Sequence, residues 1–450
     1  MNILNLIVES VNNFLWGKNI LVVMLIGAAV YFTFKTKFMQ FRMFFKIFKI
    51  LSKEKIQEGG ISSLETFFLG TACRVGAGNI AGVVAAISVG GPGAIFWMWL
   101  VALLGSATAF VESSLSVIYR KKDKNGKYIG GTPFIIEEKL RMRWLGIIYA
   151  VASIICYLGV IQVMSNSITD SVTSVYNLAD DYDPNTLKYI LSGLVTIVVA
   201  FIIFSRSKKD SIIDALNKIV PVMAVLYIGV VIYILVTNFT NIPSMISNIF
   251  QMAFGAKEIA GGGIGIVIMQ GVRRGLFSNE AGSGNSNYAA ASVDIDNPAK
   301  QGLVQALGVF TDTLIICSAT AFIVLLAPTD ITQGLNGMDL FQSSMMYHIG
   351  SLGAAFTVVI MFFFSLSTIL AVVFYGKSAV GFISQEKNIY LLYQILVIVM
   401  VFVGGIKQNI FVWSLADFGL GIMTVINILC IIPIAKPALD SLEKYKKELS

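Results

Sequence analysis

The amino-acid sequence predicts an all-α integral membrane protein with eleven transmembrane helices. Of its 450 residues, 56% are hydrophobic and only 13% are charged. Many of its apolar runs exceed the roughly 18 residues that mark a membrane-spanning helix. These runs are too long and too continuous for the weak alternating pattern of a membrane β-barrel. The composition therefore excludes a water-soluble domain and favours a polytopic helical bundle.

The basic residues predict the orientation of the chain in the membrane. The net charge is +7, and eight Lys or Arg residues fall in the single loop 120–143. Because basic loops stay on the cytoplasmic side, we expect that loop and the basic stretch 206–209 inside, and the acidic turn 180–183 outside. The N-terminus is then outside and the C-terminus cytoplasmic. The positive charge indicates a membrane, with lipid as a partner, and no nucleic acid.

The predicted spans divide the chain into five parts. Residues 1–36 hold an extra N-terminal transmembrane helix, and residues 37–57 hold a cytoplasmic interfacial amphipathic helix with phenylalanines on one face and lysines on the other. A first five-helix repeat covers residues 58–238, a second covers 239–436, and 437–450 form a cytoplasmic tail. The individual spans are expected at 14–34, 61–89, 94–119, 144–169, 189–204, 219–236, 258–291, 302–326, 349–375, 389–406 and 409–435.

Cysteine and histidine usage excludes several kinds of site. The four cysteines lie singly in four apolar segments, and His348 is the only histidine. We therefore expect no disulfide framework, no histidine metal cluster and no catalytic triad. The first apolar run lacks a basic leader and a small-residue cleavage site, so we expect it to be a retained span.

One span carries residues that a membrane helix tolerates poorly. Residues 70–82 read GTACRVGAGNIAG, which places Arg74, Gly76 and Gly78 near mid-span. Gly costs about 1 kcal/mol against Ala in a helix interior, and a mid-membrane Arg costs at least about 2.5 kcal/mol. We therefore expect the helix to be interrupted here, where it lines a polar cavity. A small-residue packing face is the alternative, since Gly78 and Gly82 have GxxxG spacing.

A second run in the other half of the chain matches the first. Residues 270–282 read QGVRRGLFSNEAG and follow glycines at 261–263 that loosen the chain. Arg274 matches Arg74, and the pattern N-x-A-G recurs with identical spacing. One segment runs outward and the other inward, which is typical of inverted-repeat transporters whose site lies where two broken helices meet.

The chemistry of such breaks suits a small zwitterion and a monovalent cation. Amides at the start of the continuing helix attract a carboxylate, and Gly76, Ala77 and Gly78 lack bulk that would keep it away. Freed carbonyls and hydroxyls are hard oxygen ligands for Na+ or an ammonium group. Ser367 and Thr368, which we expect to interrupt a neighbouring span, could add two hydroxyls, although bonding to their own preceding turn explains them equally well.

Other polar residues within the spans leave alternatives open. Gln162 and its neighbours in the span 144–169 need partners, which a cavity or helix–helix hydrogen bonds would supply. The first run has no carboxylate, which favours sodium over proton coupling, while Glu280 and Asp312 keep a proton relay open. For the arginines of both runs we prefer pairing with buried carboxylates, Glu112 included, to direct substrate contact.

Two motifs resemble one known family. The run GGPGAIFWMWLVALLG at 90–105 and the run RGLFSNEAGSG at 274–284 are similar to the signatures of the alanine or glycine:cation symporters, also called sodium:alanine symporters. The similarity extends from about residue 61 to the last span. It implies a LeuT-type fold, a 5+5 inverted-repeat bundle with one extra N-terminal span, and Na+-coupled uptake of alanine or glycine.

The resemblance also implies residue roles. The amides of Ala77 and Gly78 would hold the substrate carboxylate beside Gly76, with Asn79 facing substrate or ion. The other candidates for the substrate site are Gln162, Gln270, Gly271, Val272 and Phe277.

The sodium site would combine the carbonyl oxygens of Ala72 and Val75 with the hydroxyls of Ser367 and Thr368. The sequence departs from the LeuT-type pattern by placing Arg74 in the first break and two arginines near the second. This puts in doubt a second sodium site that uses the Arg74 carbonyl.

We therefore predict a monomeric sodium-coupled symporter of the cell membrane that takes up a very small neutral amino acid, alanine or glycine, by alternating access. A proton-coupled or betaine-like carrier of the same fold is the alternative, and betaine would require an aromatic cage, for which the two runs offer only Phe277. An enzyme is disfavoured because no catalytic constellation is in register. A channel is disfavoured because two opposed breaks favour a closed central site.

Overall fold

The computed structural model describes residues 3–53, 60–176, 183–205, 210–255, 263–406 and 410–449. The chain there is helical apart from connecting segments and one hairpin, Lys121–Lys122 (β1) with Tyr128–Ile129 (β2). The helices before the hairpin are α1 (Ile3–Asn12), a π-helical turn η1 (Asn13–Gly17), α2 (Ile20–Lys35), α3 (Met39–Arg42), α4 (Phe44–Lys53), α5 (Ser63–Arg74), η2 (Gly78–Gly82), α6 (Val83–Gly90) and α7 (Gly93–Ile118).

The hairpin leads into the rest of the bundle. The elements that follow it are α8 (Thr132–Ile135), η3 (Ile136–Leu140), α9 (Arg143–Tyr176), α10 (Pro184–Phe204), α11 (Ser211–Thr237), η4 (Phe239–Asn241), α12 (Ile242–Phe254), α14 (Ile264–Asn279), α15 (Asn287–Ala291), α16 (Pro298–Phe310), η5 (Thr311–Cys317), α17 (Ser318–Leu325), α18 (Thr329–Thr332), α19 (Gly337–Ile349), α20 (Leu352–Ile383), α21 (Lys387–Ile406), α22 (Ile410–Ile434) and α23 (Lys436–Leu449).

Capping side chains define several helix starts. The Ser62 hydroxyl accepts from the Glu65 amide while the Glu65 carboxylate accepts from the Ser62 amide, a capping box that starts α5. Asp183 accepts from the amides of the first turn of α10, and Asn297 does the same at α16. Both precede a proline, whose missing N–H costs nothing at the first helical position.

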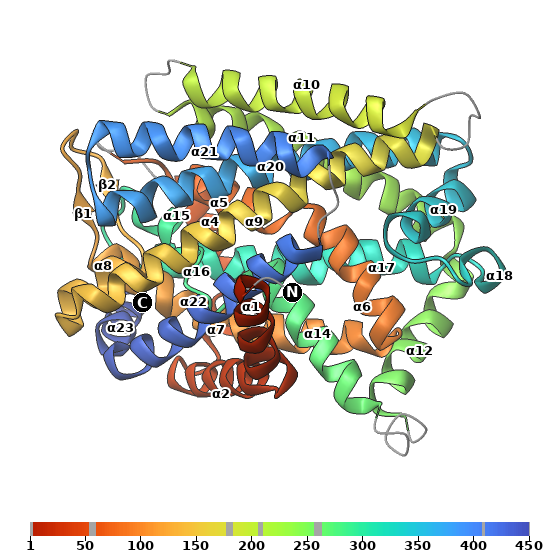
Figure 1. The fold of residues 1–450 in the computed structure, drawn as a ribbon. Coiled ribbons are helices and arrows are strands. Elements are labelled where there is room, and N and C mark those ends of the chain that lie inside the picture. Colours follow the sequence, from red (N-terminus) through yellow and green to blue (C-terminus); the bar gives the residue numbers. More distant parts are fainter. Residues whose placement is uncertain are drawn as a thin grey trace.

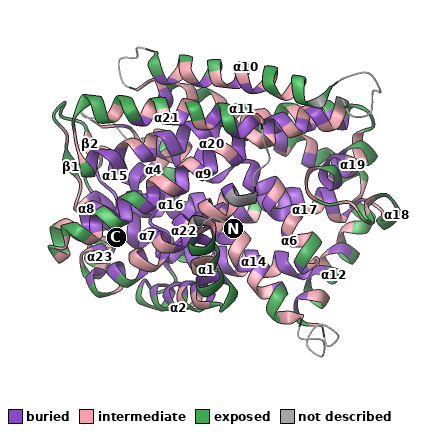
Figure 2. Ribbon diagram, viewed as in Figure 1, coloured by how far each residue is buried: buried purple, intermediate pink, exposed green. Residues whose placement is uncertain are grey.

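The helices form an inner and an outer set (Figure 1). In that view α10, α11, α20 and α21 lie along the upper edge, and α9 crosses beneath them to pack on α20, α21 and α22. Figure 2 shows that α7, α16 and α20 are mostly buried. In the most apolar window of α20, 72% of residues are buried, against 22% in α10. The exposed apolar face of the outer helices is what a bilayer requires.

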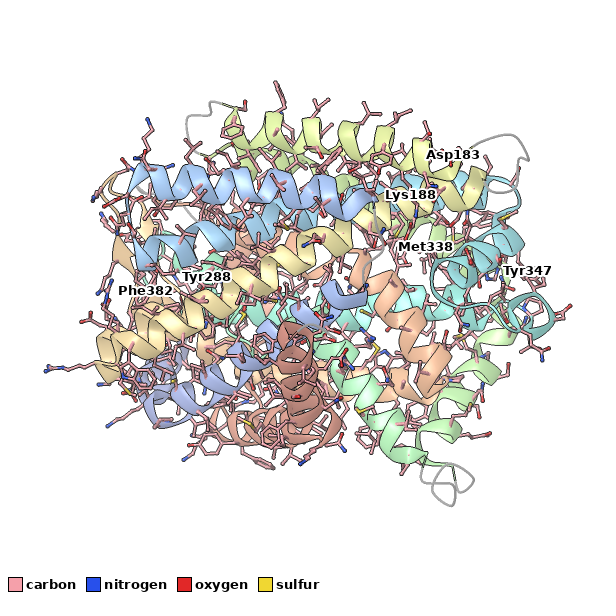
Figure 3. All side chains as sticks on the ribbon, viewed as in Figure 1. Asp183, Lys188, Tyr288, Met338, Tyr347 and Phe382 are labelled. Carbon is pink, nitrogen blue, oxygen red and sulfur yellow. The ribbon has the colours of Figure 1, made fainter. Side chains whose placement is uncertain are left out.

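Charged and polar loop residues lie at the ends of this bundle. In Figure 3, Asp183, Lys188, Met338 and Tyr347 lie toward one end and Phe382 toward the other. The start of α10 and the helix α19 therefore share one end. The basic loop is at the opposite end, where the Arg143 guanidinium lies 5.2 Å from the centre of the Phe382 ring.

The number of spans agrees with a polytopic bundle without reaching eleven. In the described residues, eight helices are long and apolar enough to cross a membrane, or ten if each of two bent pairs counts as one span. The helix α14 has 16 residues, too few for that count, and it follows a segment outside the described residues. The eleven spans, the 5+5 arrangement and the five-part division of the chain stay predictions.

Three local expectations need correction or comment. The chain bends by 46° between residues 5–17 and α2, inside the span expected at 14–34. The helix α20 continues through residues 365–368 without the expected interruption, and the hydroxyls of Ser367 and Thr368 donate to the Phe364 carbonyl of the preceding turn. The glycines at 261 and 262, the turn at 180–182 and the basic stretch at 206–209 lie outside the described residues.

Candidate functional site

The first predicted break is present. The helix α5 ends at Arg74, and the chain continues as η2 and α6 at 51° to it. Between them the Gly76 amide donates to the Arg74 carbonyl at 3.1 Å and to the Asn79 Oδ1 atom at 2.9 Å. The Asn79 side chain therefore provides the shorter of the two hydrogen bonds that this backbone donor makes at the break.

A buried polar cluster holds Asn79 in that position. Its Nδ2 donates to Asp312 Oδ1 at 2.5 Å and to the Ser278 hydroxyl at 3.1 Å. The other oxygen of Asp312 accepts from Ser278 at 2.6 Å and from Thr313 at 2.9 Å. Both carboxylate oxygens are thus occupied, and the cluster joins η2, α14 and η5. The Asn79 side chain therefore bonds to buried groups of the protein and does not line the cavity described below.

The second break lies later than the sequence predicted. The helix α14 continues through residues 270–279 and ends where Glu280 takes a left-handed conformation, with φ of 61°. A loop then leads to α15. The Glu112 carboxylate of α7 holds this loop by accepting from the amides of Gly282 and Gly284, each at 3.2 Å, and from Asn427 Nδ2 at 2.6 Å.

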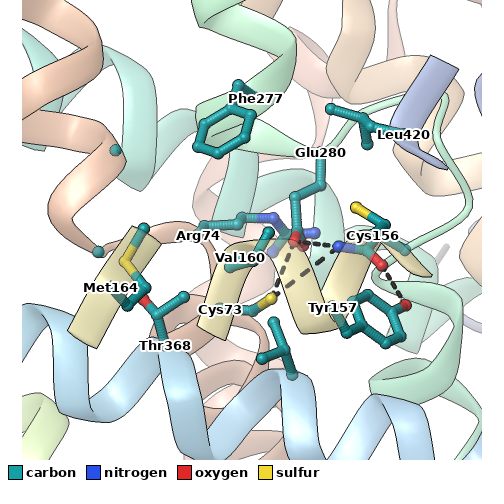
Figure 4. A pocket seen from close by; sticks show the side chains of 14 residues that line it. Cys73, Arg74, Cys156, Tyr157, Val160, Met164, Phe277, Glu280, Thr368 and Leu420 are labelled. Carbon is teal, nitrogen blue, oxygen red and sulfur yellow. Dashed lines mark hydrogen bonds between the residues drawn. The ribbon is translucent and has the colours of Figure 1, made fainter. Parts of the chain in front are cut away.

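A small cavity lies between the two breaks (Figure 4). Its volume is about 30 Å³, where one water needs about 10–15 Å³ by the same measure. The walls come from α5, the first break, α9, α14, the second break, α20 and α22. The lining residues are Cys73, Arg74, Gly76, Gly78, Cys156, Tyr157, Val160, Met164, Phe277, Glu280, Asn285, Thr368, Val372 and Leu420.

Four of the predicted site residues line this cavity: Gly76, Gly78, Phe277 and Thr368. A Cβ atom at Gly78 would lie 3.0 Å from Phe277 Cε1, so the missing side chain is what lets the Phe277 ring approach the backbone. Ala77 is buried beside them without lining the cavity.

Four other predicted residues lie away from the cavity. Gln162 faces α21, where its Nε2 lies 3.1 Å from Met400 Sδ. Because α14 is unbroken at these positions, Gln270, Gly271 and Val272 sit inside a regular helix, and a Cβ at Gly271 would meet the backbone of α7. Their roles in binding stay predictions.

The predicted sodium ligands are partly brought together. The Thr368 hydroxyl donates to the Ala72 carbonyl at 3.1 Å and to Phe364 at 3.0 Å. Val75 is the residue that follows the end of α5. Ser367 donates to the Phe364 carbonyl at 3.0 Å, as the bonding to its own helix predicts, and lies 3.5 Å from Met223 Sδ. Carbonyl and hydroxyl oxygens at the first break fit a hard monovalent cation.

The arginines find partners that the sequence did not indicate. Arg74 Nε donates to the Asn279 carbonyl at 3.0 Å, and its guanidinium fills space left by the glycines at 70 and 308. Among the described residues Arg74 forms no salt bridge. Arg273 pairs with Asp417 of α22. Arg274 lies 5.9 Å from the centre of the Trp413 ring, in a second cavity of about 440 Å³.

Sequence reasoning missed the polar side of the central cavity. Cys73 Sγ donates to Glu280 Oε1 at 2.9 Å, Asn285 Nδ2 donates to the same oxygen, and the Tyr157 hydroxyl donates to Asn285 Oδ1. The signals available were a carboxylate inside a membrane run and a tyrosine in an uncharged span. These signals did not indicate that Glu280 and Tyr157 lie in the same site.

The comparisons with known proteins agree with one another. A family model described as the sodium:alanine symporter family matches residues 1–450. The chain is 39% identical to the Probable sodium/glutamine symporter GlnT of Bacillus subtilis (strain 168), over 99% of this chain and 91% of that protein. It is 37% identical to the amino-acid carrier protein AlsT of the same organism, over 99% and 92%. It is 30% identical to the sodium/proton-dependent alanine carrier protein of Bacillus sp. (strain PS3), over 89% and 92%.

One solved structure has the same fold. The crystal structure of MhsT in complex with L-phenylalanine superposes with a TM-score of 0.58 at 15% identity, covering 86% of this chain and 99% of that one. At this identity the likeness concerns the fold alone, which is LeuT-type.

Proposed function

The chain belongs to the sodium:alanine symporter family along its whole length, and from that premise we propose that it is a Na+-coupled symporter that takes up alanine or glycine. Family membership makes it a multi-pass membrane protein that transports amino acids, not an enzyme. What we propose beyond family membership is the identity of its substrate, its coupling ion and its transport mechanism. The observation that carries the proposal is the central cavity between the two breaks.

The size of that cavity supports a very small substrate. About 30 Å³ is room for about two waters, and the walls are closely packed side chains from several helices. Glutamine adds a methylene and a carboxamide to alanine, and a cavity of this volume has no room for those added atoms. Alanine and glycine are themselves larger than two waters, but they require less enlargement of this cavity than the glutamine in the name of the relative GlnT.

The chemistry of the walls supports a zwitterion. We propose that the substrate carboxylate lies against the backbone of residues 76–78, where Gly76 and Gly78 leave the amides accessible. The ring of Phe277 covers the same side, and Val160, Val372 and Leu420 provide an apolar wall for a methyl group. The only aromatic residues of the lining are Tyr157 and Phe277, too few for the cage that betaine requires.

Na+ is the coupling ion that the oxygen atoms at the first break favour. We propose that the carbonyls of Ala72 and Val75 and the hydroxyls of Ser367 and Thr368 bind it, with Thr368 already in contact with Ala72. Proton coupling is the second candidate, because a relative is named as sodium/proton-dependent and Glu280 is buried at the cavity.

Alternating access follows from the enclosure of the site. We propose eleven spans, with α14 as the eleventh, arranged as two inverted five-helix repeats after the N-terminal span. The N-terminus is outside, the C-terminus is cytoplasmic and the protein acts as a monomer. A substrate enclosed by both broken helices can be released only if those helices or their neighbours move.

Ion-replacement uptake in proteoliposomes tests the proposal. The purified protein is reconstituted, and uptake of radiolabelled alanine, glycine and glutamine is measured with an inward gradient of Na+, of choline, or of protons alone. We expect accumulation of alanine or glycine with Na+ and none with choline. Equal uptake with choline, or a preference for glutamine, would contradict the proposal.

A further inference from the structure

We propose that the Oε2 atom of Glu280 binds the ammonium group of the transported amino acid. This inference rests on the proposed function, because it assigns a recognition role within the same cavity. Glu280 follows α14, lines the cavity (Figure 4) and is 5% exposed.

One oxygen of this carboxylate is fixed by the protein. Glu280 Oε1 accepts from Cys73 Sγ, at 2.9 Å, and from Asn285 Nδ2. Asn285 is itself held by the hydroxyl of Tyr157. The two donors to the carboxylate come from α5 and from the loop after α14, and Tyr157 of α9 fixes the second donor, so the carboxylate is held in one orientation. A carboxylate anchored through one oxygen presents the other in a defined direction.

The second oxygen has no partner. Oε2 is buried, and no donor of the protein lies within hydrogen-bond distance. Buried carboxylate oxygens are costly unless they accept hydrogen bonds or face a cation. Arg74, the cation that also lines the cavity, donates from Nε to the Asn279 carbonyl, while its Nη2 atom is buried without a partner and the residue forms no salt bridge among the described residues. The unpaired oxygen therefore matches a donor that arrives with the substrate.

An ammonium group satisfies this requirement. It carries three N–H donors and a full positive charge, and a charge-assisted hydrogen bond is about twice as strong as a neutral one. The substrate carboxylate then lies toward the glycines at 76 and 78, and the short distance between the two groups restricts binding to α-amino acids. Carboxylic acids without the amino group would leave Oε2 unpaired and bind weakly.

The test compares two ligands that differ by the ammonium group. Equilibrium binding of radiolabelled alanine to the purified protein in Na+ is measured, together with competition by propionate, for wild type and Glu280→Gln. The variant keeps an oxygen that can accept from Cys73 and Asn285 but loses the charge. We expect alanine affinity to fall about 10- to 150-fold, the equivalent of one charged hydrogen bond, with competition by propionate and the concentration of Na+ for half-maximal binding unchanged. Glu138→Gln, at an exposed carboxylate in the loop before α9, is the matched control and should bind alanine as wild type does.

The outcomes separate this inference from the proposed function. Unchanged alanine affinity in Glu280→Gln would overturn the inference, and so would an equal loss for alanine and propionate, which indicates a merely structural role. Wild-type alanine affinity combined with loss of a pH-dependent uptake step would assign Glu280 to a proton instead. Failure of wild type to bind either alanine or glycine in Na+ would overturn the proposed function itself.

Discussion

Replacing Gly76 with alanine tests how the first break meets α20. A Cβ atom at this position would overlap the Thr368 hydroxyl and lie 3.1 Å from Thr368 Cβ. The hydroxyl cannot rotate away without losing its bonds to the carbonyls of Ala72 and Phe364. The φ angle of Gly76 is outside the left-handed region, so the whole effect arises from this contact.

The size of the effect follows from the overlap. Overpacking a filled interior costs about 1–3 kcal/mol, which corresponds to roughly a 5- to 150-fold change in an equilibrium constant. Because the new Cβ atom would contact Thr368, a proposed sodium ligand, we expect this energetic cost to lower the affinity for Na+. The concentration of Na+ that gives half-maximal alanine uptake in proteoliposomes should rise by about that factor.

Two further variants separate this effect from general destabilisation. Gly82→Ala adds the same atom to the same broken helix, where its nearest neighbour is 3.9 Å away, and should behave as wild type. Gly76→Ala combined with Thr368→Ala removes the overlap with the hydroxyl and leaves only the 3.1 Å contact with the Cβ atom of residue 368, so it should recover most of the unfolding temperature without recovering the Na+ dependence. A Gly76→Ala protein with wild-type Na+ dependence would refute the reasoning.

Three other predictions follow from the same contacts. Gly78→Leu should abolish uptake while membrane yield stays normal, because its Cβ would lie 3.0 Å from the Phe277 ring; unchanged alanine affinity would remove Gly78 from the site. Asp312→Asn replaces one acceptor oxygen with a donor in a buried cluster, so the free energy of unfolding should fall by about 1–3 kcal/mol, measured as a lower unfolding temperature. Burial acts to raise the pKa of Glu137, but hydrogen bonds, the one from Arg143 among them, lower this pKa below its usual value. The stability that ionised Glu137 contributes is therefore present above about pH 4.3, the pKa of an unfolded glutamate, and is lost as the pH falls through the lower pKa of the folded state. Glu137→Gln should flatten the acid unfolding curve in that pH range.

The membrane class and the first break could be predicted because their signals are local. Apolar runs identify spans without any knowledge of tertiary contacts, and Arg74 and Gly76 are costly in a membrane helix wherever they pack. The second run misled because its glycine has another use. Gly271 lets α14 approach α7, which is the small-residue packing that we considered and set aside for the first run. A glycine in an apolar span thus indicates that something approaches the backbone closely, but the sequence alone does not tell whether a ligand or a neighbouring helix does so.

The polar side of the cavity could not be predicted because it depends on contacts across the fold. Glu280 reaches the cavity only because it adopts a left-handed conformation at the end of α14, which a non-glycine residue seldom does. Its orientation then requires Cys73 and Tyr157 from two other helices. The sequence indicates that each of these residues is unusual in a membrane span, but their meeting point follows from the packing of α5 on one side and α9 on the other.

The two breaks are built differently, and the structure joins them into one unit. The first is a bend within a helix, and the second is a loop held by the Glu112 carboxylate. Arg74 connects them through the Asn279 carbonyl, and beyond them the backbone of Ile61 pairs with that of Val293. Each of these bonds is largely shielded from water, so a change that opened one break alone would leave several buried polar groups unpaired, at about 1–3 kcal/mol each. Movements that keep the two breaks together and displace the outer helices, which have few buried residues, would avoid that cost, and we expect alternating access to use them.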